Sequence, residues 1–168
     1  MIHRPTPSEY APFYAGYVAA VEGDEVAIEG ALVTQMDETE ALLKSLDPDH
    51  RYAPGKWTVR EVVQHMIDCE RAFAFRALWW ARGSTDPLPG FDQDVWMEHA
   101  PLPEMKDLLD ELLLTRTATT GFFTRLPASA WDRGGLASGH HITVRAAFWV
   151  VLGHMAHHTR ILRERYRG

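Results

Sequence analysis

Residues 57–78 read WTVREVVQHMIDCERAFAFRAL and predict the most sharply bounded helix of the chain. Thr58 followed by Glu61 forms a capping box, in which each side chain satisfies a free amide of the first helical turn. The apolar pattern continues to about Arg82, and Gly83 is a typical residue to end a helix. This stretch therefore predicts a long, mostly buried helix and sets the frame for the rest of the chain.

Helical periodicity also dominates outside this stretch, and alternating strand patterns are scarce. Three more helices of about 20 to 25 residues are predicted, the first of them capped by Asp24. Their limits lie at Asp24 and Leu46, near Pro103 and Leu126, and at Thr143 and Tyr166. Four long helices in 168 residues predict an all-α four-helix bundle that forms a single domain over residues 1–168.

A long connection, residues 83–103, joins the second predicted helix to the third and contains four prolines. About twenty extended residues span roughly 60 Å, against ~37 Å for a 25-residue helix, so these two helices can run parallel. Within the connection, Asp92, Asp94 and Trp96 either overhang the mouth of a pocket or belong to an ordinary solvated loop. Residues 128–141 form a second irregular stretch, whose two histidines are predicted to lie on the surface.

Three histidines predict a metal site. His154 and His158 lie four positions apart on the fourth predicted helix, so their imidazoles share one face. His65, on the second helix, can complete a three-nitrogen site, which leaves the open position typical of a catalytic metal. The three reach a similar depth if these two helices run antiparallel. His157 also shares a face with His154, and spacing alone does not choose between His157 and His158.

Several side chains flank the predicted site. Asp68 either accepts a hydrogen bond from a liganding imidazole or pairs with Arg71. Cys69 either acts as a ligand or nucleophile beside a metal, or fills the core as a small apolar residue. The aromatic side chains that follow are predicted in the core or in a dimer interface: Phe73, Phe75, Trp79 and Trp80.

Composition limits the classes of function. Net charge is −6 with acidic and basic residues interleaved, so no basic block is available for nucleic acid. No apolar run approaches the roughly twenty residues of a membrane span. The single cysteine forms no internal disulfide, which agrees with a cytoplasmic location. A small-molecule substrate is the partner that these features favour.

Three segments together resemble the DinB-like (DinB/YfiT) superfamily: residues 51–78, LPGFDQD at 88–94, and GHMAHHTRIL at 153–162. The resemblance implies a four-helix bundle with a long crossover between helices two and three. It also implies a divalent metal held by His65, His154 and His158, and so favours His158 over His157. Family members are often homodimers, and some are transferases or isomerases that use low-molecular-weight thiols such as bacillithiol or mycothiol.

These observations favour a divalent-metal-dependent enzyme that acts on a small molecule, as a thiol-dependent transferase or a hydrolase. Imidazole ligands suit zinc, nickel and iron alike, so the sequence does not identify the ion. The first alternative is a non-catalytic protein that binds a metal or small ligand in a stress response. A helical interaction module without a metal is the second.

Overall fold

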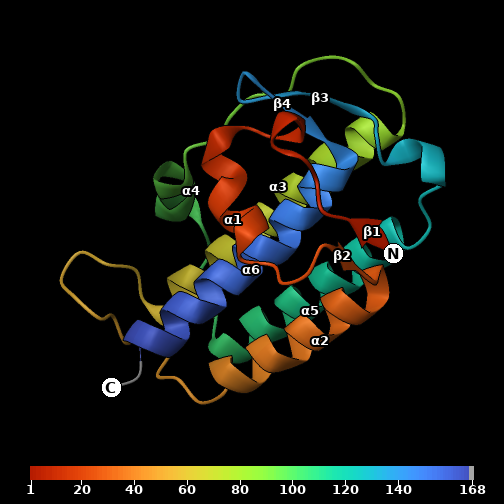
Figure 1. Ribbon diagram of the computed structural model, residues 1–168. Coiled ribbons are helices and arrows are strands. Elements are labelled where there is room, and N and C mark those ends of the chain that lie inside the picture. The colour runs from red at the N-terminus through yellow and green to blue at the C-terminus, as the bar shows by residue number, and fades with distance from the viewer. Residues whose placement is uncertain (167–168) are drawn as a thin grey trace.

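The structure is a computed structural model that describes residues 1–166, and it is predominantly helical (Figure 1). Residues 167 and 168, the last of the predicted domain, lie outside the described residues. The four long helices are α2 (Ile28–Leu43), α3 (Val59–Ala81), α5 (Met105–Phe123) and α6 (Val144–Arg165). Shorter helices are α1 (Ala15–Ala19), α4 (Gln93–His99) and 3-10 turns at Pro7–Glu9, Pro12–Tyr14 and Ala128–Ala130.

The four long helices form the predicted bundle. Helix α3 packs against α5 and α6, and α2 completes the bundle by packing against the same two helices. At one end, the Tyr166 hydroxyl after α6 donates to the Trp57 carbonyl just before α3, at 2.8 Å. At the other end, the Arg133 guanidinium, which precedes α6, donates to the Ala81 carbonyl at the end of α3. Helices α3 and α6 are therefore antiparallel, as the histidine positions predicted.

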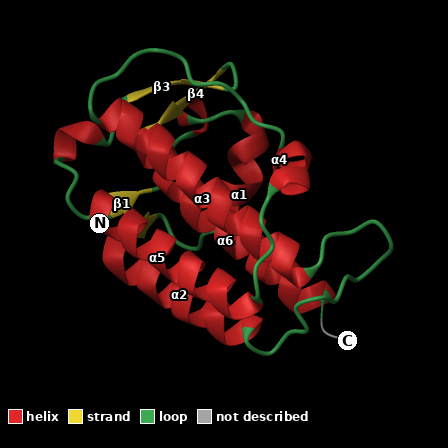
Figure 2. Cartoon of the chain, turned by 180° about the vertical axis from the view of Figure 1, so that it is seen from behind, coloured by secondary structure: helices red, strands yellow, loops and turns green. Residues whose placement is uncertain are grey.

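Helices α3 and α5 run parallel. Arg71 reaches Glu111 at 2.6 Å, and eleven residues later in each helix Arg82 lies 6.0 Å from the ring centre of Phe122. The connection between the helices must consequently return along the length of the bundle, and Figure 2 shows the segment after α4 running back to the start of α5. The predicted long crossover is confirmed.

Two helix starts agree with their predicted caps. The Thr58 hydroxyl accepts from the Glu61 amide at 3.2 Å, and the Glu61 carboxylate accepts from the Thr58 amide at 2.6 Å. Thr143 caps α6 by accepting from the Ala146 amide at 3.0 Å. The polar side chains at these positions satisfy amides that the helix itself leaves free.

The predicted cap at Asp24 is wrong. Helix α2 begins four residues later, at Ile28, and its first residue follows Ala27 without a side-chain cap. The chain before it is held extended, because β2 (Glu25–Val26) pairs with β1 (Ile2–His3) in a two-stranded antiparallel sheet. Pairing with a segment distant in sequence outweighs the local capping preference of Asp24.

The two stretches predicted as irregular contain short ordered elements. In the second, β3 (Gly134–Ala137) and β4 (His140–Thr143) form a hairpin whose two turn residues, Ser138 and Gly139, both have positive φ, as such turns require. In the first, Leu88 bridges to the hairpin, and α4 follows. Strands of four residues are too short for their alternation to stand out in a sequence. The two histidines of β4 are exposed, as predicted.

The core consists of two apolar clusters, one toward the hairpin end of the bundle and one toward the opposite end. Phe73 and Trp80 are buried in the first cluster, whereas Phe75 is half exposed. His65 and His154 are buried between residues of the two clusters. None of the helices within residues 1–166 is both long and apolar enough to cross a membrane.

Candidate metal centre

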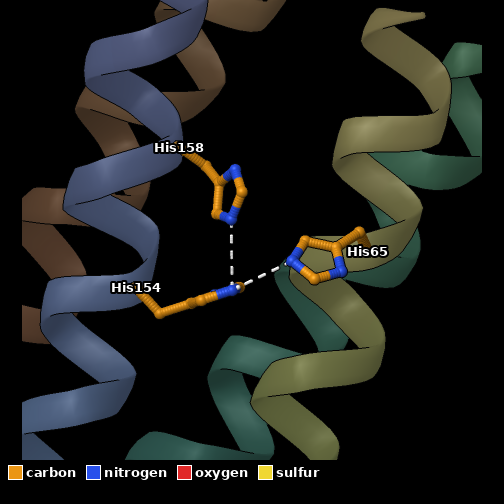
Figure 3. A group of neighbouring side chains, drawn as sticks. All are labelled: His65, His154 and His158. Atoms are coloured by element: carbon orange, nitrogen blue, oxygen red, sulfur yellow. Dashed lines mark hydrogen bonds between the residues drawn. The ribbon is translucent and has the colours of Figure 1, made fainter. Parts of the chain in front are cut away.

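The antiparallel pair α3 and α6 brings the three predicted histidines together (Figure 3). His65 projects from α3, and His154 and His158 project from successive turns of α6. The Nε2 atom of His154 lies 3.1 Å from that of His65 and 3.2 Å from that of His158. One nitrogen of each ring lies within 4.8 Å of one nitrogen of both others.

These distances fit a metal. Two imidazole nitrogens bound to one zinc ion at 2.0–2.1 Å and a tetrahedral angle are roughly 3.3 Å apart. Hydrogen bonding alone explains the cluster less well, since a neutral Nε2 carries either one hydrogen or one lone pair. His154 Nε2 can therefore form only one good hydrogen bond to its two close neighbours. A cation placed among the three nitrogens would use all of their lone pairs.

The electrostatics of the cluster also suit a cation. Burial lowers the pKa of His65 to about 4 and that of His158 to about 3, and the neighbouring histidines add to both shifts. Burial likewise holds the pKa of His154 well below its usual value. All three rings are therefore neutral at pH 7, which is the form that ligates metals.

Aromatic rings surround the histidines. The ring centre of Trp57 lies 5.0 Å from that of His65, and Phe73 lies 5.7 Å from His154. Tyr17 of α1 covers the other side of His154, with ring centres 5.2 Å apart. These rings restrict water around the cluster and fix the imidazole orientations.

Gly153 permits the close approach of α1. A Cβ atom at this position would overlap the backbone carbonyl of Tyr17. Position 153 directly precedes His154, and only a residue without a side chain at this position lets α1 lie this close to α6. The glycine therefore helps to place the Tyr17 ring over the site.

A cavity of about 800 Å³ opens in front of the histidines. His65, His154 and Cys69 contribute to its lining, and Arg76 of α3 lines another part of it. Its remaining wall comes from the α1 region, the crossover and the hairpin. A volume of this size accommodates a small organic molecule.

The crossover contributes to the mouth of this cavity. Asp92 and Asp94 are exposed and line it, which confirms one of the two interpretations of this loop. Asp92 also caps α4 by accepting from the amides of Asp94 and Val95. Trp96 instead lines a neighbouring apolar cavity of about 640 Å³.

The other side chains singled out in the sequence lie at different distances from the histidines. The Asp68 carboxylate accepts a hydrogen bond from Gln64 at 3.1 Å, and Arg71 forms an ion pair with Glu111. Neither side chain bonds to an imidazole of the cluster, and the two do not form an ion pair with each other. Cys69 lies beside the His65 ring, with Sγ 3.6 Å from Nδ1. Burial raises the pKa of this thiol to about 12, so it is protonated at neutral pH.

His157 does not join the cluster. Its ring packs edge-on against Tyr17 at 5.4 Å, while His158 turns its Nε2 toward His154. The rotation of about 100° between consecutive residues of a helix thus separates the two adjacent histidines, one against α1 and one toward α3. This placement agrees with the position that the sequence resemblance gave to His158.

Three residues near the site were missed in the sequence. Tyr17 and Gly153 act through a contact between segments more than 130 positions apart, which no local pattern reveals. Arg76 did leave a signal, because it is a charged residue within the apolar run AFAFRALWW. A cation on the buried face of a helix needs an explanation, and the sequence alone does not supply one.

The fold and the site together define a helical bundle with a candidate three-histidine metal centre between two antiparallel helices. The chain belongs to the DinB superfamily, whose family model matches residues 31–162. Its structure is similar to that of YfiT from Bacillus subtilis, with a TM-score of 0.70 and 19% sequence identity. The similarity covers 86% of this chain and 90% of YfiT, which is described as a probable metal-dependent hydrolase with an unusual four-helix bundle topology. No curated protein matches the chain in sequence.

Proposed function

We propose that this protein is a metal-dependent enzyme that acts on a small molecule by hydrolysis or by transfer of a low-molecular-weight thiol. The observation that carries the proposal is the convergence of three neutral imidazole nitrogens beside a cavity of about 800 Å³. Membership of the DinB superfamily and the description of YfiT as a probable metal-dependent hydrolase support it.

His65, His154 and His158 would hold the ion, which can be zinc, nickel or iron(II) because imidazole suits all three. When bound, a divalent ion supplies Lewis acidity and lowers the pKa of a water or thiol ligand. Three neutral ligands leave the full positive charge of the ion in place, which maximises this effect. The same site therefore suits either water or a thiol as the nucleophile.

The chain's own residues would shape the reaction around that ion. Tyr17, Phe73 and Trp57 pack against the imidazoles and hold them in place. The Cys69 thiol lies beside His65, with Sγ 3.6 and 3.7 Å from its two ring nitrogens, so it would be a near neighbour of the bound ion. Asp92 and Asp94 lie at the cavity mouth, where substrate would enter.

The metal site is tested by measuring metal content on untagged protein by mass spectrometry. We expect about one ion per chain in wild type and in His157→Ala, which changes the neighbouring histidine outside the cluster. We expect loss of the ion in His65→Ala, His154→Ala and His158→Ala. Absence of metal in wild type after dialysis against zinc, nickel and iron(II) would rule out the metal-dependent function.

Two assays on the metal-loaded protein separate the chemistries. Hydrolysis is followed with p-nitrophenyl acetate, and thiol transfer with 1-chloro-2,4-dinitrobenzene plus bacillithiol or cysteine. Turnover that disappears in His65→Ala while the fold persists supports an enzyme and identifies the reaction class. A tightly held ion, loss of folding on chelation and no turnover of either substrate would instead support the non-catalytic binding protein.

We further propose, from the family resemblance, that the protein is a cytoplasmic homodimer. Exposed apolar side chains on α3 and α5, including Phe75 and Leu114, are compatible with a second subunit. Light scattering during size-exclusion chromatography measures the mass directly. A mass of about 19 kDa, that of one chain, would contradict the dimer.

A further inference from the structure

We propose that Arg76 binds the carboxylate of the substrate, so that the cavity in front of the histidines takes a small organic carboxylate with an apolar or aromatic body. This inference rests on the proposed function, because it concerns the same cavity. It adds a substrate class that the metal cluster alone does not define.

The first argument is the unbalanced charge of Arg76. Its side chain is buried, with 4% exposure, and it forms no ion pair with any carboxylate among residues 1–166. Its three hydrogen bonds go to neutral oxygens: Tyr14 Oη at 3.2 Å, the Pro89 carbonyl at 3.0 Å and Ser138 Oγ at 3.4 Å. A buried cation without a counter-charge is costly, and an anionic ligand would remove that cost.

The second argument is the hydrogen-bonding capacity that Arg76 retains. A guanidinium has five N–H donors. The bonds to Tyr14, Pro89 and Ser138 use one donor of Nη1 and both donors of Nη2, so the Nε hydrogen and one Nη1 hydrogen remain for a ligand. Each of these two donors can form a charge-assisted hydrogen bond to an anion, which is stronger than a bond to a neutral oxygen. Arg76 thus retains hydrogen-bonding capacity for an anionic group such as a carboxylate.

The third argument is the position of Arg76 relative to the histidines. Its guanidinium carbon lies 5.9 Å from the ring centre of Phe73, which lies 5.7 Å from that of His154, so the span cannot exceed about 12 Å. Arg76 and His154 line the same cavity. A small molecule can therefore place its carboxylate at Arg76 and its reacting group near the histidines.

The fourth argument is the nature of the cavity wall. Phe13, Tyr17, Phe73 and Phe91 line the cavity and supply aromatic surface beside Arg76 and the histidines. The Arg76 guanidinium lies over the rings of Phe73 and Phe91, at 5.9 and 5.2 Å. This combination of a fixed cation and aromatic walls suits a ligand whose apolar body separates its carboxylate from its reacting group.

The acidic residues of the cavity do not cancel this preference. Asp92 and Asp94 also line it, but both are exposed, and solvent screens their charges. Arg76 is buried, so its charge acts on a ligand through a medium of lower polarity. The buried cation therefore outweighs the exposed carboxylates in its effect on a bound ligand.

Benzoate and its neutral analogue benzamide provide the test, measured by calorimetric titration of metal-free and zinc-loaded protein. We expect benzoate to bind both forms and benzamide to bind more weakly. Arg76→Gln should weaken benzoate binding about 10- to 100-fold, the worth of hydrogen bonds to a charged group. Arg71→Gln is the matched control, because it removes the same charge from the same helix, at a residue already paired with Glu111.

The zinc content of each variant is measured in parallel. If Arg76→Gln does not fold, Arg76→Lys, which keeps the charge but loses the paired donors, should still bind benzoate more weakly than wild type. The inference is overturned if metal-free wild type does not prefer benzoate to benzamide, or if substitution of Arg76 has no effect. If wild type binds no zinc but still binds benzoate in a way that depends on Arg76, the metal-dependent function is overturned and this inference stands.

Discussion

Two buried polar clusters lie in the bundle, and they differ in how their charges and hydrogen bonds are matched. In one, the Arg116 guanidinium of α5 donates to Glu70 of α3 at 2.8 Å and to Gln35 of α2 at 3.1 Å. Gln35 in turn donates to the Leu152 carbonyl of α6 at 2.8 Å. This charge-balanced cluster links all four long helices.

The histidine cluster has the opposite character. Three like nitrogen atoms converge, and the two Nε2 separations of 3.1 and 3.2 Å cannot both be good hydrogen bonds. The charges of the ion-pair cluster balance within the protein, although Glu70 Oε1 and Arg116 Nε are buried without a hydrogen-bond partner, whereas the histidine cluster would gain its missing partner from a cation. Buried polar groups alone, even those without a partner, thus do not identify a functional site; the convergence of three ligand nitrogens beside a cavity distinguishes the histidine cluster.

The largest expected effect comes from breaking the ion pair. Glu70→Ala leaves Arg116 buried and uncompensated, and we expect the free energy of unfolding to fall by about 3–5 kcal/mol. Urea unfolding of metal-free protein, followed by tryptophan fluorescence, measures this change. The double variant Glu70→Leu/Arg116→Met removes both charges and should lose much less; an equal loss would show that the pair is not balanced as described.

Acidification should destabilise the metal-free protein through the histidine cluster. The pKa of His65 is about 4 in the folded state against 6.5 for an unperturbed histidine, so the unfolded chain binds a proton first as pH falls. The contribution of the neutral His65 ring to the free energy of unfolding, about 3 kcal/mol, is fully present above pH 6.5 and is lost as the pH falls from about 6.5 to 4. Urea unfolding of the metal-free protein at several pH values measures this loss of stability. His65→Gln should flatten the curve in this window, and an unchanged curve would contradict the burial of a neutral ring.

Zinc should stabilise the wild type and so distinguish the two clusters. At a free concentration of 100 times Kd, a ligand that binds only the folded state adds about 2.7 kcal/mol. We expect this gain in wild type and in Glu70→Leu/Arg116→Met, and none in His154→Ala. Thermal unfolding with and without zinc checks all three proteins. Stabilisation of His154→Ala to the same extent would mean that zinc binds elsewhere.

The smallest expected effect concerns the packing that covers the histidines. Gly153→Ala forces α1 away from α6, and we expect a loss of about 1–3 kcal/mol, as for other overpacked sites. Gly16→Ala makes the same substitution on α1, where an added Cβ meets no atom within 4 Å. This control should be neutral or stabilising by up to about 1 kcal/mol. Equal behaviour of the two variants in chemical unfolding would argue against the close helix contact.

The helices and the histidine cluster were predictable because their signals are local or repeat along a helix. The capping box at Thr58 marks a helix start directly. Helical spacing placed both His157 and His158 on a face shared with His154, and the family resemblance chose His158. The antiparallel arrangement of α3 and α6 followed from requiring the three histidines to meet at one depth. The metal role of these residues stays a prediction.

The remaining features depend on contacts between distant segments. Asp24 was predicted as a cap, but pairing between β1 and β2 holds its neighbours extended. Arg116 forms an ion pair with Glu70, whereas Arg76 has no carboxylate partner among residues 1–166. This difference depends on which helices pack together, and the sequence around the two arginines does not reveal it. The hairpin that carries Ser138 is too short to show alternation. A single sequence contains the local preferences but not the contacts that decide between them.

The order of the helices around the bundle has a consequence for synthesis of the chain. Each of the two earlier long helices, α2 and α3, packs chiefly against the two later ones, α5 and α6. The first half of the chain consequently lacks the main packing partners of α2 and α3 as it leaves the ribosome, so much of their apolar surface stays exposed until α5 and α6 have been made. Folding should be a single late event, and the pocket that would receive an ion forms only when the fourth long helix has been made.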